Sequence, residues 1–302
     1  MDLPGIRAIL GEDADVLLGT DPGGVGPRAR LLPGPDFVER AWSNGPIPAF
    51  RRNFQALFDA GRLAGTGHLC LLDLVGPAED PARFGELAVE GGCSGLVLAL
   101  RHLDTIAPRF AHRLPLIVGI SADADAFVLR RVRDAGAVGV ELSLPEDIDG
   151  AAIVAAAAAE GLPALLSPLT AAAEPSVTGA LAAFGAAMVA VDLAGPPALR
   201  PRPHKVAEAL HPEDVGPALL ALKAGHQRAG RAATLGSVPW GGAAGPGGSL
   251  RRALRGAVLH KRAGGFGAIA GLAATALPLE DAVALLHAVQ DVWACGAIGL
   301  AR

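Results

Sequence analysis

From residue 67 onward, short continuous apolar runs alternate with helical patterns eight times, and this repeat constrains the fold more than any other feature. Parallel strands that are covered on both faces read as such continuous runs, whereas half-exposed strands alternate. Eight strand–helix units predict an α/β fold, a (β/α)8 TIM barrel. An open doubly wound sheet is the alternative, but residues 73–77 lack the glycine-rich phosphate fingerprint of that fold. The expected strands are 68–73, 95–100, 116–121, 138–142, 164–167, 188–192, 232–235 and 267–271.

The first 66 residues show helical periodicity without good strands. Ile6, Leu10, Val16 and Leu17 indicate one short helix, and the spacing of apolar residues over 50–63 indicates a second. We therefore predict an N-terminal helical extension over residues 1–66 and a barrel over residues 67–302.

Composition narrows the partners and the chemistry. A net charge of −4 favours neither nucleic acid nor a membrane as partner. Without a signal peptide or an apolar run of ~18 residues, we expect a cytoplasmic protein. Three cysteines without metal or redox spacing indicate reduced core or interface thiols. The chain has no tyrosine, and only Lys205, Lys223 and Lys261 could form a Schiff base.

In a barrel, the residues at the carboxyl ends of the strands line the active site. Asp73 is the strongest catalytic candidate, because a carboxylate that ends an apolar strand can transfer a proton or orient a substrate hydroxyl. Glu141 and Asp192 are further strand-end candidates, and the three acids together could bind a divalent cation, although we expect no metal and no cofactor. The other polar residues at this end are Arg101, His102, Ser121, Ser143 and Ser167.

Five of the eight histidines show no metal-binding spacing, and we expect them at surface or helix-end positions. They are His204, His211, His226, His260 and His287.

A glycine-rich segment over residues 236–248 precedes a predicted helix. Barrels often bind phosphate in the loops after strands seven and eight, where bare backbone N–H groups face the anion. We therefore predict phosphate binding by Gly241, Gly242, Gly245 and Gly271, with a flexible linker as the alternative.

The segment Lys261-Arg262-Ala263-Gly264-Gly265 resembles the turn into the last barrel strand of class I fructose-bisphosphate aldolases of the bacterial and archaeal type. The resemblance implies cleavage of fructose 1,6-bisphosphate through a lysine Schiff base, in a homo-oligomer. Lys261 and Arg262 also suit a helix C-terminus, and Gly264 a helix end, so we expect this segment to serve folding at the amino-terminal face. The resemblance extends over residues 9–18, 32–40, 60–67, 90–93, 111–118 and 288–293.

The chain differs from that family at the positions that carry the family's chemistry. The resemblance puts the Schiff-base lysine at Ala190, the acid/base tyrosine at Leu169 and a lysine of strand three at Gly119. The arginine that follows Gly271 in the family is Leu272 here. Asp73 matches the family's aspartate after strand one.

Three hypotheses follow from these departures. The favoured one is a pseudo-aldolase that at most binds a phosphorylated sugar. The alternative is an altered phosphosugar lyase or isomerase that uses Asp73 with Asp192 or Glu141. The third is a structural or scaffolding subunit.

Overall fold

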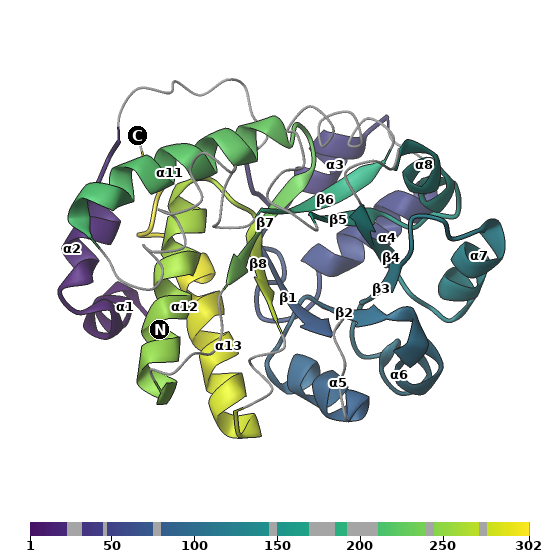
Figure 1. Cartoon of the computed structure of the whole chain (residues 1–302), viewed down its shortest axis with the longest axis horizontal. Coiled ribbons are helices and arrows are strands. Elements are labelled where there is room, and N and C mark those ends of the chain that lie inside the picture. Colours follow the sequence, from purple (N-terminus) through teal and green to yellow (C-terminus); the bar gives the residue numbers. More distant parts are fainter. Residues whose placement is uncertain are drawn as a thin grey trace.

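The computed structural model describes residues 1–22, 32–44, 47–74, 80–144, 150–168, 185–191, 211–238, 245–271 and 277–301. Eight parallel strands close into a barrel in sequence order, β1 to β8, with β8 paired to β1 (Figure 1). This confirms the predicted (β/α)8 fold. The strands are β1 Leu69–Leu74, β2 Gly95–Ala99, β3 Leu116–Ile120, β4 Gly139–Leu144, β5 Ala164–Pro168, β6 Ala186–Val191, β7 Ala233–Val238 and β8 Gly267–Ala270.

Helices surround the barrel and lie between most of the successive strands in the chain, and α13 follows β8 (Figure 1). The predicted helix over 176–184 lies outside the described residues. The outer helices are α5 Pro81–Glu90, α6 Leu103–Phe110, α7 Ala126–Asp134, α8 Ala151–Ala159, α11 Pro212–Arg228, α12 Gly245–Arg262 and α13 Leu279–Ala294, with a short 3-10 helix η1 Leu100–His102 after β2. The helices before β1 are α1 Leu3–Leu10, α2 Asp13–Gly19, α3 Phe37–Trp42 and α4 Pro48–Phe58.

The single helix that we predicted near residues 6–17 is wrong, because the chain forms two helices that are separated at Gly11. Gly11 has φ of 62°, a left-handed conformation that ends α1. The predicted helix over 50–63 ends at Phe58, and α3 was missed because its six residues are too few to show a period. The boundary at residue 66 stays a prediction.

The interior of the barrel is filled by apolar side chains that continue into α3 and α4. Leu71, Val97 and Leu235 belong to one cluster with Phe37 and Phe54. The ring centroids of Phe37 and Phe266, the residue before β8, lie 4.3 Å apart. Helices α3 and α4 therefore cover the amino-terminal end of the barrel, which leaves its carboxyl end for polar residues.

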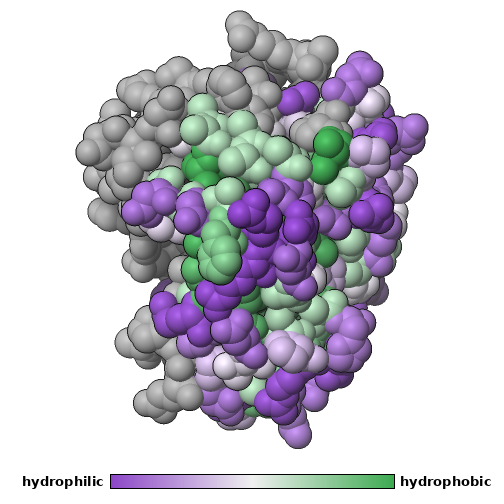
Figure 2. Space-filling view, turned by 90° about the vertical axis from the view of Figure 1, so that its right-hand side faces the viewer, coloured by the Kyte–Doolittle hydropathy of each residue, from purple (hydrophilic) through white to green (hydrophobic). Residues whose placement is uncertain are grey.

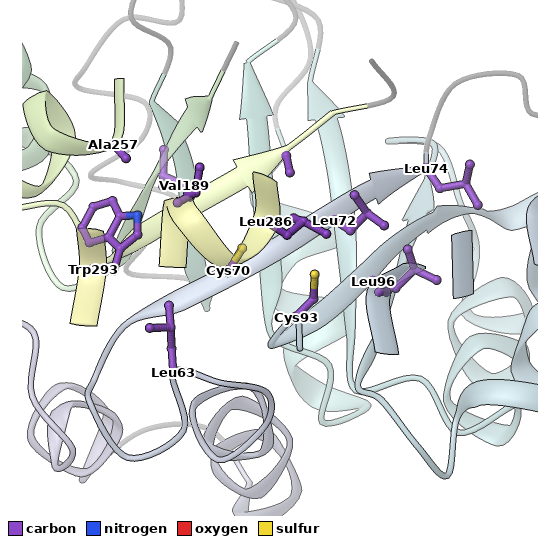
Figure 3. Close-up of a cluster of buried hydrophobic side chains, with 14 of the residues drawn as sticks. Leu63, Cys70, Leu72, Leu74, Cys93, Leu96, Val189, Ala257, Leu286 and Trp293 are labelled. Carbon is purple, nitrogen blue, oxygen red and sulfur yellow. The ribbon is translucent and has the colours of Figure 1, made fainter. Parts of the chain in front are cut away.

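A second cluster fills the layer between the strands and the outer helices. Cys70 and Leu72 of β1 contribute to it together with Leu286 and Trp293 of α13 (Figure 3). Cys70 and Cys93 are free and buried, which confirms the prediction of core thiols for these two. Strand positions thus alternate between the barrel interior and the helix layer.

The outer surface over α7 and α8 is divided by polarity. The exposed positions of α8 are all alanine, whereas α7 exposes charged residues together with Phe127, which is 67% exposed. Figure 2 shows this side of the molecule, with hydrophobic areas beside a hydrophilic band. In the part of the chain that the structure covers, no helix is both long and apolar enough to cross a membrane.

Candidate functional site at the carboxyl end of the barrel

Asp73 and Glu141 both face the barrel interior near its carboxyl end. Asp73 follows Leu71 of the interior cluster by two residues, so the two side chains share a face of β1. Glu141 lies in register with Leu165 of β5, which belongs to the same cluster. Of the three strand-end acids that the sequence suggested, the structure places these two inside the barrel, and Asp192 lies outside the described residues.

Glu141 is only 5% exposed, and hydroxyl groups hold its carboxyl group. The Ser143 hydroxyl donates a hydrogen bond of 3.0 Å to Oε1 of Glu141, and Ser167 on the neighbouring strand also bonds to the carboxyl. Ser143 and Ser167 are in register, so closure of the sheet brings both to Glu141. The sequence named these two serines as strand-end residues but gave no signal of this shared contact.

Burial raises the pKa of the Glu141 carboxyl, and the nearby charge of Asp73 raises that pKa further. The hydrogen bonds from Ser167 and Ser143 act in the opposite direction, because they stabilise the ionised form. Asp73 is half-buried and Glu141 is buried, so the two carboxyl groups differ in their access to water. Two acids in unequal surroundings are the arrangement that separates a general acid from a general base.

Ala190 occupies the interior of β6, where the family resemblance expects a lysine. It is 7% exposed, lies in register with Leu235 and belongs to the interior apolar cluster. A methyl side chain has no amine, so this position cannot form an iminium with a carbonyl substrate.

The described lysines lie away from the barrel interior. Lys261, at the end of α12, donates hydrogen bonds from Nζ to the carbonyl oxygens of Val292, Trp293 and Cys295, at 2.9, 2.8 and 2.7 Å. Burial lowers the pKa of Lys261 to about 8. Lys223 is on α11 in the outer layer, and Lys205 lies outside the described residues.

The predicted phosphate site is described only in part. Gly241 and Gly242 lie outside the described residues, and Gly245 is the first residue of α12. Gly271 directly follows β8, is half-buried, and has no atom of the described residues within 4 Å of the place where a Cβ would be. Among the described residues, Gly271 therefore has open space at the carboxyl end of β8.

The other strand-end residues have less defined roles. Arg101 and His102 lie in η1 directly after β2, and Ser121 is exposed after β3. Among the described residues, no three histidine, cysteine, aspartate or glutamate side chains are grouped so that they could hold a metal ion.

Two of the histidines that we expected at surface or helix-end positions lie near helix ends, and the structure adds that both are buried. His226 and His260 are both 0% exposed, although each lies near the end of its helix. Their ring centroids are 5.6 Å apart, and Nδ1 of His226 lies 2.7 Å from the Thr234 hydroxyl. The only sequence signal for this pair is glycine at positions 236 and 265, where side chains would collide with or crowd the rings.

Closure of eight parallel strands places the protein among the (β/α)8 barrels. In that fold the active sites lie at the carboxyl ends of the strands. No family model matches the chain. The probable class 1 fructose-bisphosphate aldolase of Chlamydia muridarum is 31% identical over a 131-residue alignment that covers 38% of this chain and 37% of the relative. That of Chlamydia trachomatis is 30% identical over a 128-residue alignment that covers 37% of this chain and 36% of the relative.

These matches span little more than a third of the relatives' own length. They confirm the resemblance to class 1 fructose-bisphosphate aldolases that residues 261–265 first indicated.

Solved structures show the same fold at low sequence identity. An archaeal fructose-1,6-bisphosphate aldolase, with its catalytic lysine bound to the carbinolamine intermediate, has a TM-score of 0.53 at 14% identity over 80% of this chain and 98% of its own. A tryptophan synthase α-subunit from Pyrococcus furiosus has a TM-score of 0.52 at 13% identity over 75% and 98%. Because two different enzymes fit equally well, the fold does not select the activity.

Proposed function

We propose that the protein is an aldolase-type barrel that binds a phosphorylated sugar at the carboxyl end of its strands and forms no Schiff base. The observation that carries the proposal is Ala190, which is buried in the interior of β6. The resemblance to class 1 fructose-bisphosphate aldolases supports a sugar phosphate as ligand. Open space at Gly271 and the start of α12 after β7 support a phosphate position between β7 and β8. We also expect a cytoplasmic homo-oligomer.

Ligand-dependent stability tests the binding. A ligand that binds only the folded protein, at a concentration 100 times its Kd, adds about 2.7 kcal/mol to the free energy of unfolding. We expect fructose 1,6-bisphosphate or dihydroxyacetone phosphate to raise the melting temperature, and fructose at the same concentration to have no effect. Gly271→Asp should abolish the rise, because it places a negative charge beside the expected phosphate.

Gly296→Asp is the matched control, since Gly296 also has open space at its Cβ position but follows α13. It should retain the ligand-induced rise. If fructose 1,6-bisphosphate, dihydroxyacetone phosphate and glyceraldehyde 3-phosphate all leave the melting temperature unchanged, the binding proposal fails. A scaffolding subunit then becomes the better description.

The absence of a Schiff base is tested separately. Borohydride treatment in the presence of fructose 1,6-bisphosphate should leave the mass of the protein unchanged, because Ala190 has no amine. A covalent adduct on any lysine, or cleavage that disappears when one lysine is replaced, would contradict the proposal.

A second candidate function is an altered phosphosugar lyase or isomerase that uses Asp73 and Glu141. The observation in its favour is the electrostatic contact between the two carboxyl groups inside the barrel, one buried and one half-buried. This candidate needs the same ligand position and adds proton transfer to it.

A further inference from the structure

We propose that Cys70 and Cys93 form a reversible disulfide when the protein meets a peroxide, so that the pair is an oxidative modification site in the wall of the barrel. Cys70 lies in β1, and Cys93 lies two residues before the start of β2. Both are free thiols in the structure. The proposal concerns the layer between the strands and the outer helices, and it is independent of any ligand at the carboxyl end of the barrel.

The backbone brings the two cysteines to the separation that a disulfide needs. Leu71 lies opposite Gly95, so Ser94 lies opposite Cys70. The Ser94 N–H donates to the Cys70 carbonyl oxygen over 2.7 Å, and the Cys70 N–H donates to the Ser94 hydroxyl over 3.1 Å. Cys93 is one residue further back, so a strand spacing of about 4.8 Å and a rise of about 3.3 Å put the two cysteine Cα atoms about 6 Å apart. Disulfides usually join Cα atoms that are roughly 4.4–6.8 Å apart.

The two side chains also lie on the same side of the strands. Cys70 and Cys93 belong to the cluster that packs against the outer helices, and Figure 3 shows them next to one another on neighbouring segments. A hydrogen bond joins the two thiol groups. Formation of the bond therefore requires the sulfur atoms to approach each other, and it does not require the strands to move apart or slide.

Burial keeps the pair reduced until a small oxidant reaches it. Cys70 is 0% exposed and Cys93 is 2% exposed, and the hydrogen bond with Cys70 together with burial raises the pKa of the Cys93 thiol. The thiolate is the reactive form, so the reaction waits for local opening. Cys93 directly follows half-buried Gly92, and the Arg62 side chain, which is 38% exposed, packs on Gly92. A long, partly exposed side chain moves aside more easily than the core, so this turn is the route for the oxidant.

The reaction with hydrogen peroxide balances in two steps. In the first step one cysteine sulfur attacks a peroxide oxygen, the S–O bond forms as the O–O bond breaks, and the thiol proton leaves with the departing oxygen as water. In the second step the other sulfur attacks the first, the S–S bond forms, and the displaced hydroxide takes the second thiol proton as water. The two sulfurs lose two electrons in total, and the two peroxide oxygens gain them.

Peptide mapping of the folded protein after peroxide treatment tests the proposal. Trypsin places the two cysteines in different peptides, residues 63–83 and 84–101, and Cys295 in residues 263–302. After alkylation of the remaining thiols, we expect the first two peptides to be linked and dithiothreitol to release them. If peroxide oxidises the partly exposed Cys295 while residues 63–83 and 84–101 stay separate, the proposal is wrong.

Variants show whether the two sulfurs react with each other. Cys295→Ser is the matched control and should keep the link between the two peptides. Cys93→Ser should lose it, and so should Cys93→Val, whose apolar side chain suits the buried position if serine weakens the fold. A link from residues 63–83 to residues 263–302 in the wild type would identify a different pair and overturn the proposal.

The melting temperature tests whether the folded chain accommodates the bond. The oxidised protein should melt at a higher temperature, because the disulfide closes residues 70–93 into a loop and restricts the unfolded chain. Dithiothreitol should restore the starting value, and peroxide-treated Cys93→Ser should show no rise. A lower melting temperature of the linked protein would show that the bond distorts the barrel, which contradicts the separation inferred from the strand register.

Discussion

Several residues of this chain are small because distant side chains need the space. Gly236 of β7 is one of them, since a Cβ there would lie 2.3 Å from the ring of His260 on α12. Gly265 is another, with His226 at 3.2 Å from its Cβ position. Gly264, by contrast, is required for its backbone, because φ of 90° ends the turn after α12. The two adjacent glycines of the segment 261–265 are thus required for different physical reasons, one for space and one for backbone conformation.

We expect Gly236→Ala to lower the free energy of unfolding by about 1–3 kcal/mol, because the added methyl group overpacks a site that is already full. Urea unfolding measures this change. Gly271→Ala is the matched control at the end of the neighbouring strand, where the Cβ has open space, and it should have little effect. Equal stability of the two variants would show that the His260 ring moves aside easily.

At the scale of elements, α12 joins the N-terminal helices and α13 to the barrel. Lys261 binds three carbonyl oxygens at the end of α13. Arg262 binds the carbonyl oxygens of Leu17 and Thr20 at 2.7 Å each and also pairs with Asp21. Both cations therefore neutralise the negative C-terminal ends of other helices. The prediction that they serve folding at the amino-terminal face agrees with these contacts, although the helix ends they bind are not their own.

The pair Asp13–Arg255 links α2 to α12 and offers a clean test of this arrangement. Nε of Arg255 donates to Asp13 over 2.8 Å, and both side chains are nearly inaccessible to water. Asp13→Asn should lower the free energy of unfolding by about 3 kcal/mol, because it removes the charge of a nearly buried carboxylate that pairs with the Arg255 guanidinium. Chemical unfolding in urea measures the loss.

Asp15→Asn is the control on the same helix, since Asp15 pairs with Arg7 at the surface and is 86% exposed. Its effect should stay below about 1 kcal/mol. If Asp13→Asn lowers the free energy of unfolding no more than Asp15→Asn does, the contact of α2 with α12 contributes little to stability.

The whole molecule should lose stability in mild acid. Burial lowers the pKa of His260 to about 4, and burial together with the charge of Lys261 lowers the pKa of His68 to about 4. Both groups bind protons more weakly in the folded state than in the unfolded state, whose histidine pKa is about 6.5. Stability from this source is therefore complete above pH 6.5 and is lost as the pH falls toward 4.

For His260 the loss from pH 7 to pH 4 should be on the order of 3 kcal/mol. His260→Phe keeps a ring in place and removes the titration, so its unfolding free energy should fall less between pH 7 and pH 5. Urea unfolding at the two pH values tests this. An unchanged pH dependence in His260→Phe would mean that His260 is not the group that titrates.

The barrel could be predicted because its signal is local and repeated. Each apolar run and each helical pattern occupies fewer than 20 residues, and their order alone indicates a closed parallel sheet. Helix α3 was not predicted because six residues do not establish a helical period. The break at Gly11 was not predicted because a glycine with a left-handed backbone interrupts an otherwise helical pattern.

The order of apolar runs and helical patterns was enough to indicate the barrel, and the residue type alone shows that position 190 carries no amine. Tertiary structure alone decided that Glu141 lies beside Ser143, Ser167 and the charge of Asp73, and that His226 and His260 are buried. The physical reason is that burial and hydrogen-bond partners come from residues far apart in the chain. Closure of the sheet brings those residues together, and their joint surroundings, rather than the residue types, set the protonation of each group.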